Sequence, residues 1–308
     1  MPSISSAKEI KKRALQFLEN NIKLENIDDM QLEMFKNHVR KEYEMIPEKE
    51  RIGKGLVYIS RHIASALYKF IKDNFSRNEH SNNDIMEEKY TNKFVKKVLE
   101  IIKLLERDEI TIYISIFLSA NLALEHFEET IPLIERWLND EDWKIRECSI
   151  HPMLSGLKKN RDKALEILDR WSDSDNHNYR RFVAESLRPK ADIKWLRDPE
   201  HNDKILEIIT KLNHDKSIYV RKAVGNNLKD LTKYMPDKIL KLIEEWLEKK
   251  DSMVLEDQKN LMWTIFQALR WLKDRNPNYH EWIKRLVGEN YILYFDEKRN
   301  RWAIPPDT

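Results

Sequence analysis

The chain repeats itself between about Ile131 and Leu272. Four similar apolar segments end at Trp137, Trp171, Leu212 and Trp246, which stand 34, 41 and 34 residues apart. A short acidic turn follows the first three segments, and a second amphipathic segment begins eight residues after each anchor, at Ile145, Tyr179 and Val220. The spacing of apolar residues in both segments is typical of helices. The sequence therefore predicts a series of helix pairs, with a fourth second helix at about Leu255 to Leu272.

A paired-helix unit of roughly 35–45 residues is the size of a HEAT or armadillo repeat. One pair cannot bury its apolar face alone, so neighbouring pairs stack. We therefore expect an all-α, HEAT-like α-solenoid, a superhelix of stacked helix pairs. The composition agrees, because 35% of the 308 residues are charged and only five are glycine. Those few glycines form no phosphate-binding fingerprint, which excludes kinases, P-loop enzymes and dinucleotide oxidoreductases.

Three regions are expected along the chain: N-terminal helices in residues 1–127, the repeats in 128–288 and a tail in 289–308. Alternating residues in Tyr291 to Ile304 predict a short C-terminal β-hairpin. The polar segment Arg77 to Asp84 is the best candidate for a loop. The apolar pattern predicts N-terminal helices at the following positions: Ala7 to Glu19, Asp29 to Tyr43, Gly55 to Phe75, Thr91 to Arg107 and Glu109 to Phe127.

The bulk properties point to the cytoplasm. The first residues, Met1 to Arg13, are polar and basic, and no apolar run is long enough to cross a bilayer. Cys148 is the only cysteine, so no intrachain disulfide forms. The net charge of +2 argues against a non-specific DNA-coating protein, but a balanced chain can still carry a basic groove.

The aromatic residues fall into two groups. Trp137, Trp171 and Trp246 share one repeat position, and we interpret them as core packing between helix pairs. Trp195 lies instead in a connection after Pro189, with basic neighbours. It can stack on a sugar or base, or it can close the end of a helix pair.

The second helices carry a row of arginines and three acids. The arginines can line a groove that binds phosphates, or they can form a solvated face with acidic partners at helical spacing. Glu147, Glu185 and Asp230 lie on the same helices, and Asp230 shares a face with Asn226. Such carboxylates can stabilise a sugar cation and hold a water when an N-glycosidic bond breaks, although unspecialised acids are common in helices. No histidines have zinc-ligand spacing, so we expect no metal and no cofactor.

Several motifs resemble those of the AlkC/AlkD-type alkylation-repair DNA glycosylases, and the AlkC branch most. They are Phe182-Val-Ala-Glu185-Ser-Leu-Arg-Pro189 with Trp195, Tyr219-Val-Arg-Lys-Ala-Val-Gly-Asn-Asn-Leu-Lys-Asp230, Gln267-Ala-Leu-Arg270 and Arg146-Glu147-Cys-Ser-Ile-His-Pro152. The resemblance covers about Ile131 to Gly288. It departs from the family pattern at Ser186, where glycine is usual, and at His151, where arginine is usual.

This resemblance implies a HEAT-like superhelix that excises positively charged alkylated bases from double-stranded DNA without a cofactor, as a monomer. Glu147, Glu185 and Asp230 would be the acids of the cleft, and Trp195 would pack on the deoxyribose. Arg188, Arg221 and Lys222 would contact phosphates. We expect further DNA contacts from Arg146, Arg180, Arg181, Lys190, Asn226 and Arg270. The alternative is a non-catalytic HEAT scaffold that binds DNA structure or a protein.

Overall fold

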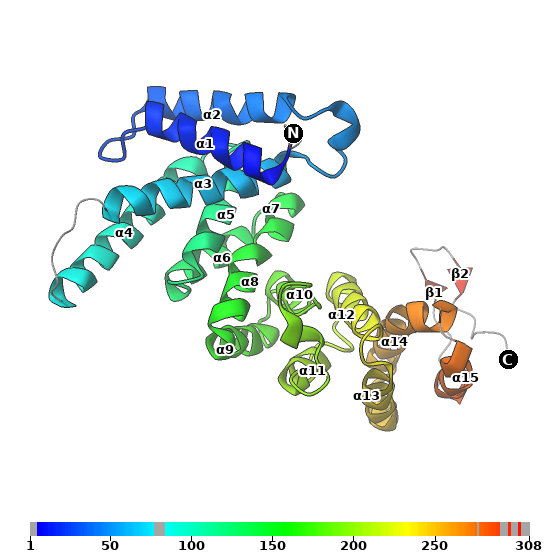
Figure 1. Cartoon of the computed structure of the whole chain (residues 1–308). Helices are drawn as coiled ribbons and strands as arrows, with labels where there is room; N and C mark the ends of the chain where they lie inside the picture. The colour runs from blue at the N-terminus through cyan, green and yellow to red at the C-terminus, as the bar shows by residue number, and fades with distance from the viewer. Residues whose placement is uncertain (1–4, 77–83, 276, 290–294, 297–300, 303–308) are drawn as a thin grey trace. The chain divides into compact units, whose positions relative to one another are not determined.

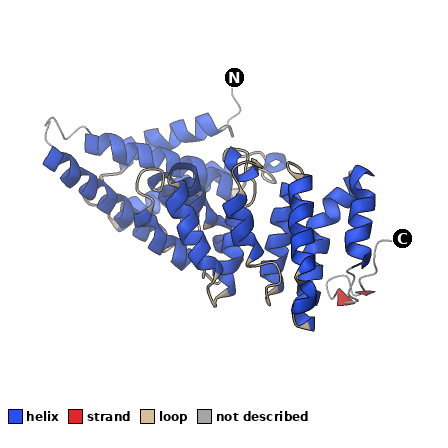
Figure 2. Cartoon of the chain, turned by 90° about the horizontal axis from the view of Figure 1, so that it is seen from below, coloured by secondary structure: helices blue, strands red, loops and turns tan. Residues whose placement is uncertain are grey.

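The computed structural model describes residues 5–76, 84–275, 277–289, 295–296 and 301–302. The chain divides into two compact units at Asn160, and each is described by itself. The division falls inside the segment 128–288 that the sequence assigns to the repeats. Helices dominate the described residues, and strands occur only near the C-terminus (Figure 2). The expected all-α class is therefore confirmed.

The first unit is built around a long central helix, α3 (Leu56–Ser76). This helix packs against α1, α2, α4 and α5, and α5 in turn packs against α7 and α8 (Figure 1). The other elements of the unit are α1 (Ala7–Asn21), α2 (Asp29–Glu44), η1 (Glu48–Glu50), α4 (Asp84–Leu105), α5 (Ile112–Leu122), η2 (Glu128–Thr130), α6 (Ile131–Trp137), α7 (Trp143–Cys148) and α8 (Ile150–Lys159).

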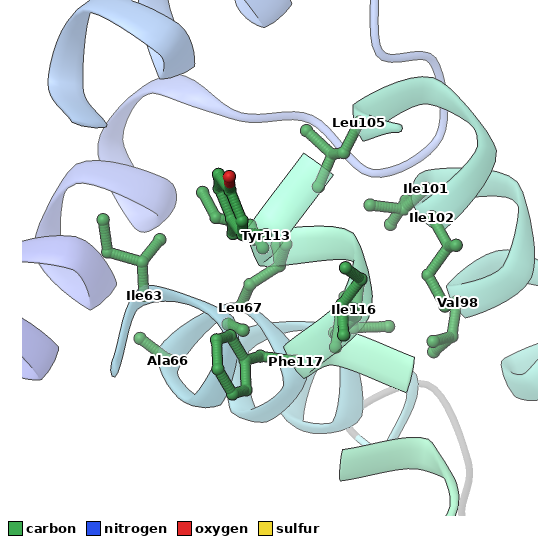
Figure 3. Packing of buried hydrophobic residues seen from close by; sticks show 14 of the residues in the cluster. Ile63, Ala66, Leu67, Val98, Ile101, Ile102, Leu105, Tyr113, Ile116 and Phe117 are labelled. Atoms are coloured by element: carbon green, nitrogen blue, oxygen red, sulfur yellow. The ribbon is translucent and has the colours of Figure 1, made fainter. Parts of the chain in front are cut away.

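One apolar cluster holds the first unit together. Helix α3 contributes Ile63 and Leu67, and α5 contributes Ile116 and Phe117, whose side chains meet in the interior (Figure 3). Helix α5 is buried on nearly all sides, which explains why its sequence is apolar without a polar face. Phe117, which is 3% exposed, also forms a floor beneath polar groups that are considered below.

The second helix of the first repeat is interrupted. The sequence predicts one helix from Ile145 onward, whereas α7 ends at Cys148 and α8 begins at Ile150. Ser149 donates its hydroxyl to the carbonyl of Arg146 at 2.7 Å. Pro152 has no N–H to donate to the carbonyl of Cys148, so one rung of the helical ladder is missing. The break therefore follows from local chemistry that a periodicity argument does not register.

The second unit consists of three helix pairs and a C-terminal extension. Its second helices form one layer, because α10 packs on α12 and α12 packs on α14; in the other layer α9 packs on α11. The elements are α9 (Arg161–Ser172), α10 (His177–Ser186), η3 (Lys194–Arg197), α11 (Asp203–Thr210), α12 (Ile218–Leu231), α13 (Pro236–Glu248), η4 (Lys250–Ser252), α14 (Leu255–Arg275), η5 (Pro277–Tyr279), α15 (His280–Glu289), β1 (Phe295–Asp296) and β2 (Arg301–Trp302).

The repeat anchors pack as predicted. Trp137 is buried in the first unit, and Trp171, Leu212 and Trp246 are buried in the second. The indole N–H of Trp246 also donates to the Thr210 hydroxyl at 3.1 Å, which satisfies the one polar atom that burial would otherwise leave unpaired.

In each of the first three repeats, an arginine near the start of the second helix donates hydrogen bonds to the turn that precedes that helix. Nη1 of Arg180 donates to the carbonyls of Ser174 and Asp175, six and five residues earlier, at 2.7 and 2.8 Å. Arg146 and Arg221 make the same pair of contacts to the carbonyls at the same offsets. Because the contact recurs in register, these three arginines belong to the repeat scaffold.

The remaining predictions about elements have mixed outcomes. Phe295 pairs with Trp302 and Asp296 with Arg301, which confirms a short antiparallel hairpin within Tyr291 to Ile304, whose other residues lie outside the described part of the chain. The proposed loop from Arg77 also lies outside that part, except for Asp84, which begins α4. The helix expected from Glu109 to Phe127 is shorter, because α5 runs only from Ile112 to Leu122. None of the described helices combines the length and the apolar character that a bilayer crossing requires.

The first unit buries a histidine that should make its stability sensitive to acid. Both ring nitrogens of His62 are buried and have no hydrogen-bond partner among the described residues. Burial, together with the charges of Lys11 and Arg61, lowers the pKa of His62 from 6.5 to about 4. Between pH 6.5 and 4, His62 is therefore protonated in the unfolded chain but largely neutral in the folded chain. The stability that depends on neutral His62 is present above pH 6.5 and is lost as the pH falls toward 4.

We expect His62→Leu to flatten this part of the pH dependence. Allowing for the partial exposure of the ring, the wild type should lose on the order of 1 kcal/mol more than the variant between pH 6.5 and 4. Urea unfolding followed by circular dichroism at several pH values measures the difference. The same substitution at exposed His177 is the control and should leave the profile unchanged. Equal slopes for wild type and His62→Leu would contradict the prediction.

Candidate functional site

Two of the three predicted acids meet in the second unit, and an arginine joins them. Arg188 donates from Nη1 to Oε2 of Glu185 at 2.9 Å. It donates from Nη2 and Nε to Oδ2 of Asp230, at 2.6 and 3.2 Å. Glu185 lies at the end of α10 and Asp230 at the end of α12, so the contact bridges two neighbouring repeats. We call Glu185, Arg188 and Asp230 the acid–arginine cluster.

Two lysines complete the surroundings of Asp230. Lys229 and Lys233 approach its Oδ1 at 3.1 and 2.9 Å. Burial alone would raise the pKa of Asp230, but hydrogen bonds from Arg188, Lys233 and Lys229 outweigh it and lower the pKa to about 2. Asp230 therefore stays negatively charged throughout the neutral and weakly acidic range, and it cannot serve there as a general acid.

The register between α10 and α12 brings the cluster together. The buried side chain of Asn227 donates to the Ala184 carbonyl across the helix pair at 2.9 Å. On the opposite side, a Cβ at Gly225 would come within 2.5 Å of the Gln267 Cβ, so only glycine lets α12 approach α14 this closely. These two contacts fix the helix that carries Asp230 against both neighbours.

Lys190 lies at the edge of the cluster, in the connection that follows α10. Burial lowers the pKa of Lys190, and the charge of Arg188 lowers it further, whereas Glu185 and Asp230 act in the opposite direction. The acids are thus surrounded by Arg188, Lys190, Lys229 and Lys233. The site combines an anionic centre with a cationic rim.

The polar network continues along α12 to α14. Arg270 donates to the side-chain oxygens of Asn226 and Gln267. Asn226 precedes Asp230 by four residues, so both lie on one face of α12. The structure therefore places predicted residues Glu185, Asp230, Asn226 and Arg270 on the second helices of this unit, and Arg188 directly after α10.

Trp195 lies in a connection that is firmly held. The guanidinium of Arg161 lies 4.2 Å from the centre of its ring and also donates to the His201 carbonyl at 2.8 Å. Ile193 and Leu196, on either side of Trp195, are buried. Trp195 itself is half-buried in η3. Arg161 was not anticipated from the sequence, because nothing in the motif marks a residue 34 positions away.

Glu147 belongs to the first unit, where it lies half-buried near the end of α7. On the next turn of the chain, His151 Nε2 lies 3.5 Å from Nη2 of Arg61, which comes from α3. Arg61 was also missed from the sequence, since α3 precedes the repeats and shares no motif with them.

The other predicted DNA contacts occupy different environments. Arg180 forms a bidentate ion pair with Asp215, with Nε to Oδ2 at 2.6 Å and Nη2 to Oδ1 at 3.1 Å. Arg221 is half-buried, lies 5.6 Å from the ring centre of Trp263, and has a pKa lowered by burial. Arg181 is half-buried and Lys222 is exposed. Contact of Arg146, Arg180, Arg181, Arg221 and Lys222 with DNA stays a prediction.

Among the described residues, Asp198, Glu200 and His201 place possible metal-ligand atoms within 4.8 Å of one another. Asp198 accepts the N–H of Glu200 at 3.0 Å and contacts His201 Nδ1 at 2.9 Å. These contacts are those of a turn closed by an aspartate side chain, which explains the cluster without a metal.

The paired helices and the polar second-helix layer define a HEAT-like repeat protein. The family described as "DNA alkylation repair enzyme" matches residues 82–272. This chain therefore belongs to the DNA alkylation repair enzyme family.

Two structures and one curated protein are similar to the chain. AlkD2 from Streptococcus mutans is 23% identical with a TM-score of 0.53, covering 78% of this chain and 98% of that one, which supports the fold. The alkylpurine DNA glycosylase AlkC from Pseudomonas fluorescens, bound to DNA containing an abasic site analog, is 17% identical with a TM-score of 0.44, covering 93% and 66%. The uncharacterized protein YhaZ of Bacillus subtilis is 32% identical over 131 residues, or 40% of this chain. The match spans 34% of the length of that relative.

Proposed function

We propose that this protein is a monofunctional DNA glycosylase that hydrolyses the N-glycosidic bond of cationic N3- or N7-alkylated bases in double-stranded DNA. The observation that carries the proposal is the acid–arginine cluster. It holds two carboxylates on neighbouring repeats, joined by Arg188, within a rim of basic side chains. Family membership supports the same class of activity.

The charge state of the cluster matches the chemistry that such a reaction needs. A cationic base is already a good leaving group, so the enzyme does not have to protonate it. The sugar becomes an oxocarbenium-like cation, which negative charge stabilises most strongly in the transition state. Asp230, with its pKa of about 2, supplies a permanent negative charge. Glu185, held through Arg188, can orient the attacking water.

The basic rim serves the DNA backbone in this proposal. Lys229 and Lys233 contact the carboxylate of Asp230, and the charges of both acids act on Lys190. In the proposal these lysines contact phosphates that flank the damaged nucleotide, since phosphate contacts position the protein on DNA. Trp195 is the aromatic residue that would pack on the deoxyribose. Glu147 is the third proposed catalytic acid.

Two observations favour the alternative, a non-catalytic HEAT scaffold that binds DNA structure or a protein. Both acids of the cluster are neutralised in part by Arg188, and the guanidinium of Arg161 lies over the ring of Trp195. A scaffold would use these contacts to hold its repeats together. A glycosylase must release at least one carboxylate toward the sugar when DNA binds.

Base release from methylated DNA separates the two functions. We expect excess wild-type protein to release 3-methyladenine or 7-methylguanine from duplex DNA treated with a methylating agent, as measured by chromatography of the free bases. The abasic product should remain uncut, because the proposed reaction is attack by water and forms no covalent bond between a lysine and the sugar. Salt-sensitive binding to DNA without any base release would establish the scaffold instead.

A further inference from the structure

The first unit contains an exposed guanidinium that is held in place without a carboxylate. Arg61 makes no ion pair within 4.0 Å among the residues that the structure describes. Other arginines of the same unit are neutralised: Arg13 pairs with Glu42 and Arg136 with Glu106, both at 2.6 Å. No carboxylate of the described residues therefore offsets the charge of Arg61, which is exposed.

The surroundings of Arg61 preorganise its guanidinium. The group lies 5.0 Å from the ring centre of Phe117, and its Nη2 lies 3.5 Å from Nε2 of His151. The His151 ring lies 4.6 Å from the same phenyl ring. Phe117 is part of the buried core and cannot move freely (Figure 3). The guanidinium of Arg61 and the imidazole of His151 thus both pack on the ring of Phe117. Most of the five N–H donors of Arg61 stay available for a ligand.

Two positive side chains lie near His62 on α3. The positive charges of Lys11 and Arg61 both act on His62, which places two cations beside the same stretch of α3. In the second unit, Arg188 lies next to acids on two second helices. In the first unit, Arg61 of α3 instead lies next to the imidazole of His151, which belongs to α8. A guanidinium without an acidic partner, next to a second nitrogen group, suits a planar, bidentate contact with phosphate oxygens.

We propose that Arg61 and His151 form a binding site for a phosphodiester group of the DNA backbone. The inference rests on the proposed function, because it assumes that the chain binds DNA. It extends the interface to α3, which precedes the residues 82–272 that match the family. The N-terminal helices then act as part of the DNA-binding surface as well as a packing partner for the repeats.

Substitution of Arg61 should weaken binding to undamaged duplex. We expect Arg61→Gln, which keeps the stem over Phe117, to lower the affinity about tenfold at low salt. It should also reduce the slope of log K against log salt by about 1, because one phosphate contact is lost. Fluorescence anisotropy with a short labelled duplex measures both quantities. Lys69→Ala removes a positive charge from the same helix and is the matched control, with little expected change.

A compensating substitution tests the geometry. In Arg61→Gln/His151→Arg, the new guanidinium starts beside the vacated position and should restore most of the affinity and of the salt slope. Equal binding by Arg61→Gln, Lys69→Ala and wild type would overturn this site alone, provided that the wild type binds duplex and releases methylated bases. A wild type that binds no duplex would overturn the proposed function with it. Circular dichroism of each variant excludes unfolding as the cause.

Discussion

Asp230→Asn should reduce the release of methylated bases by about 100-fold or more. The substitution keeps the shape of the side chain and an oxygen that accepts hydrogen bonds, but it removes the negative charge that we assign to the stabilisation of the sugar cation. Arg188, Lys229 and Lys233 all contact this carboxylate, so its charge is the centre of the site. Single-turnover assays with protein in excess measure the rate of the chemical step.

DNA binding provides the readout that separates catalysis from simple loss of affinity. Removal of a negative charge from a basic rim should leave the affinity for undamaged duplex unchanged or raise it. Asp169→Asn is the matched control, because Asp169 also pairs with two lysines, Lys204 and Lys211, and has a lowered pKa, yet lies on the first helix α9. Excision by Asp230→Asn within about threefold of the control would show that this carboxylate is not catalytic.

The repeat architecture could be predicted because it depends on local pattern. Trp171 and Trp246 recur at one helical position, and large apolar side chains at a recurring helical position are buried between packed helices. The interruption at Ser149 was not anticipated, because it arises from one hydroxyl and one missing N–H rather than from a change in hydrophobic spacing.

The acids of the site could be selected from the sequence, but the sequence did not predict that Glu185 and Asp230 would lie close together. Glu185 and Asp230 are 45 residues apart in the chain, and each has helical neighbours that offer simpler partners. Their common contact with Arg188 depends on the offset between α10 and α12. Asn227 and Gly225 set that offset through contacts with Ala184 and Gln267, which only the packed structure reveals.

Recurrence within the chain distinguishes the arginines. Arg146, Arg180 and Arg221 occupy one repeat position, and all three hold the turn that precedes their own helix. Arg188 has no arginine at the equivalent place in the other repeats, and it contacts the acids. An arginine that recurs at the same repeat position stabilises the repeat fold, whereas an arginine that occurs in one repeat only is the better candidate for a functional site. The sequence held this signal, but a row of arginines also suits a phosphate-binding groove.

Arg180→Ala should therefore destabilise the protein by about 3–5 kcal/mol, more than a DNA contact would. The Asp215 side chain is 5% exposed, and Arg180 neutralises it through two hydrogen bonds. Truncation of Arg180 leaves that carboxylate buried and charged, and it also frees the carbonyls of Ser174 and Asp175. Urea unfolding of the full chain, followed by circular dichroism, measures the loss.

A second substitution shows where the loss comes from. Arg180→Ala/Asp215→Asn removes the unpaired charge but keeps the side-chain oxygen that accepts the Ser217 N–H at 2.8 Å. We expect the double variant to be more stable than Arg180→Ala alone, because the two residues form one coupled pair. If Arg180 mainly contacted phosphate, Arg180→Ala would unfold like the wild type and lose only DNA affinity. If the stability changes of the two substitutions are not additive, Arg180 instead serves to join two repeats. The phosphates would then be bound by the basic rim of the acid–arginine cluster and by Arg61.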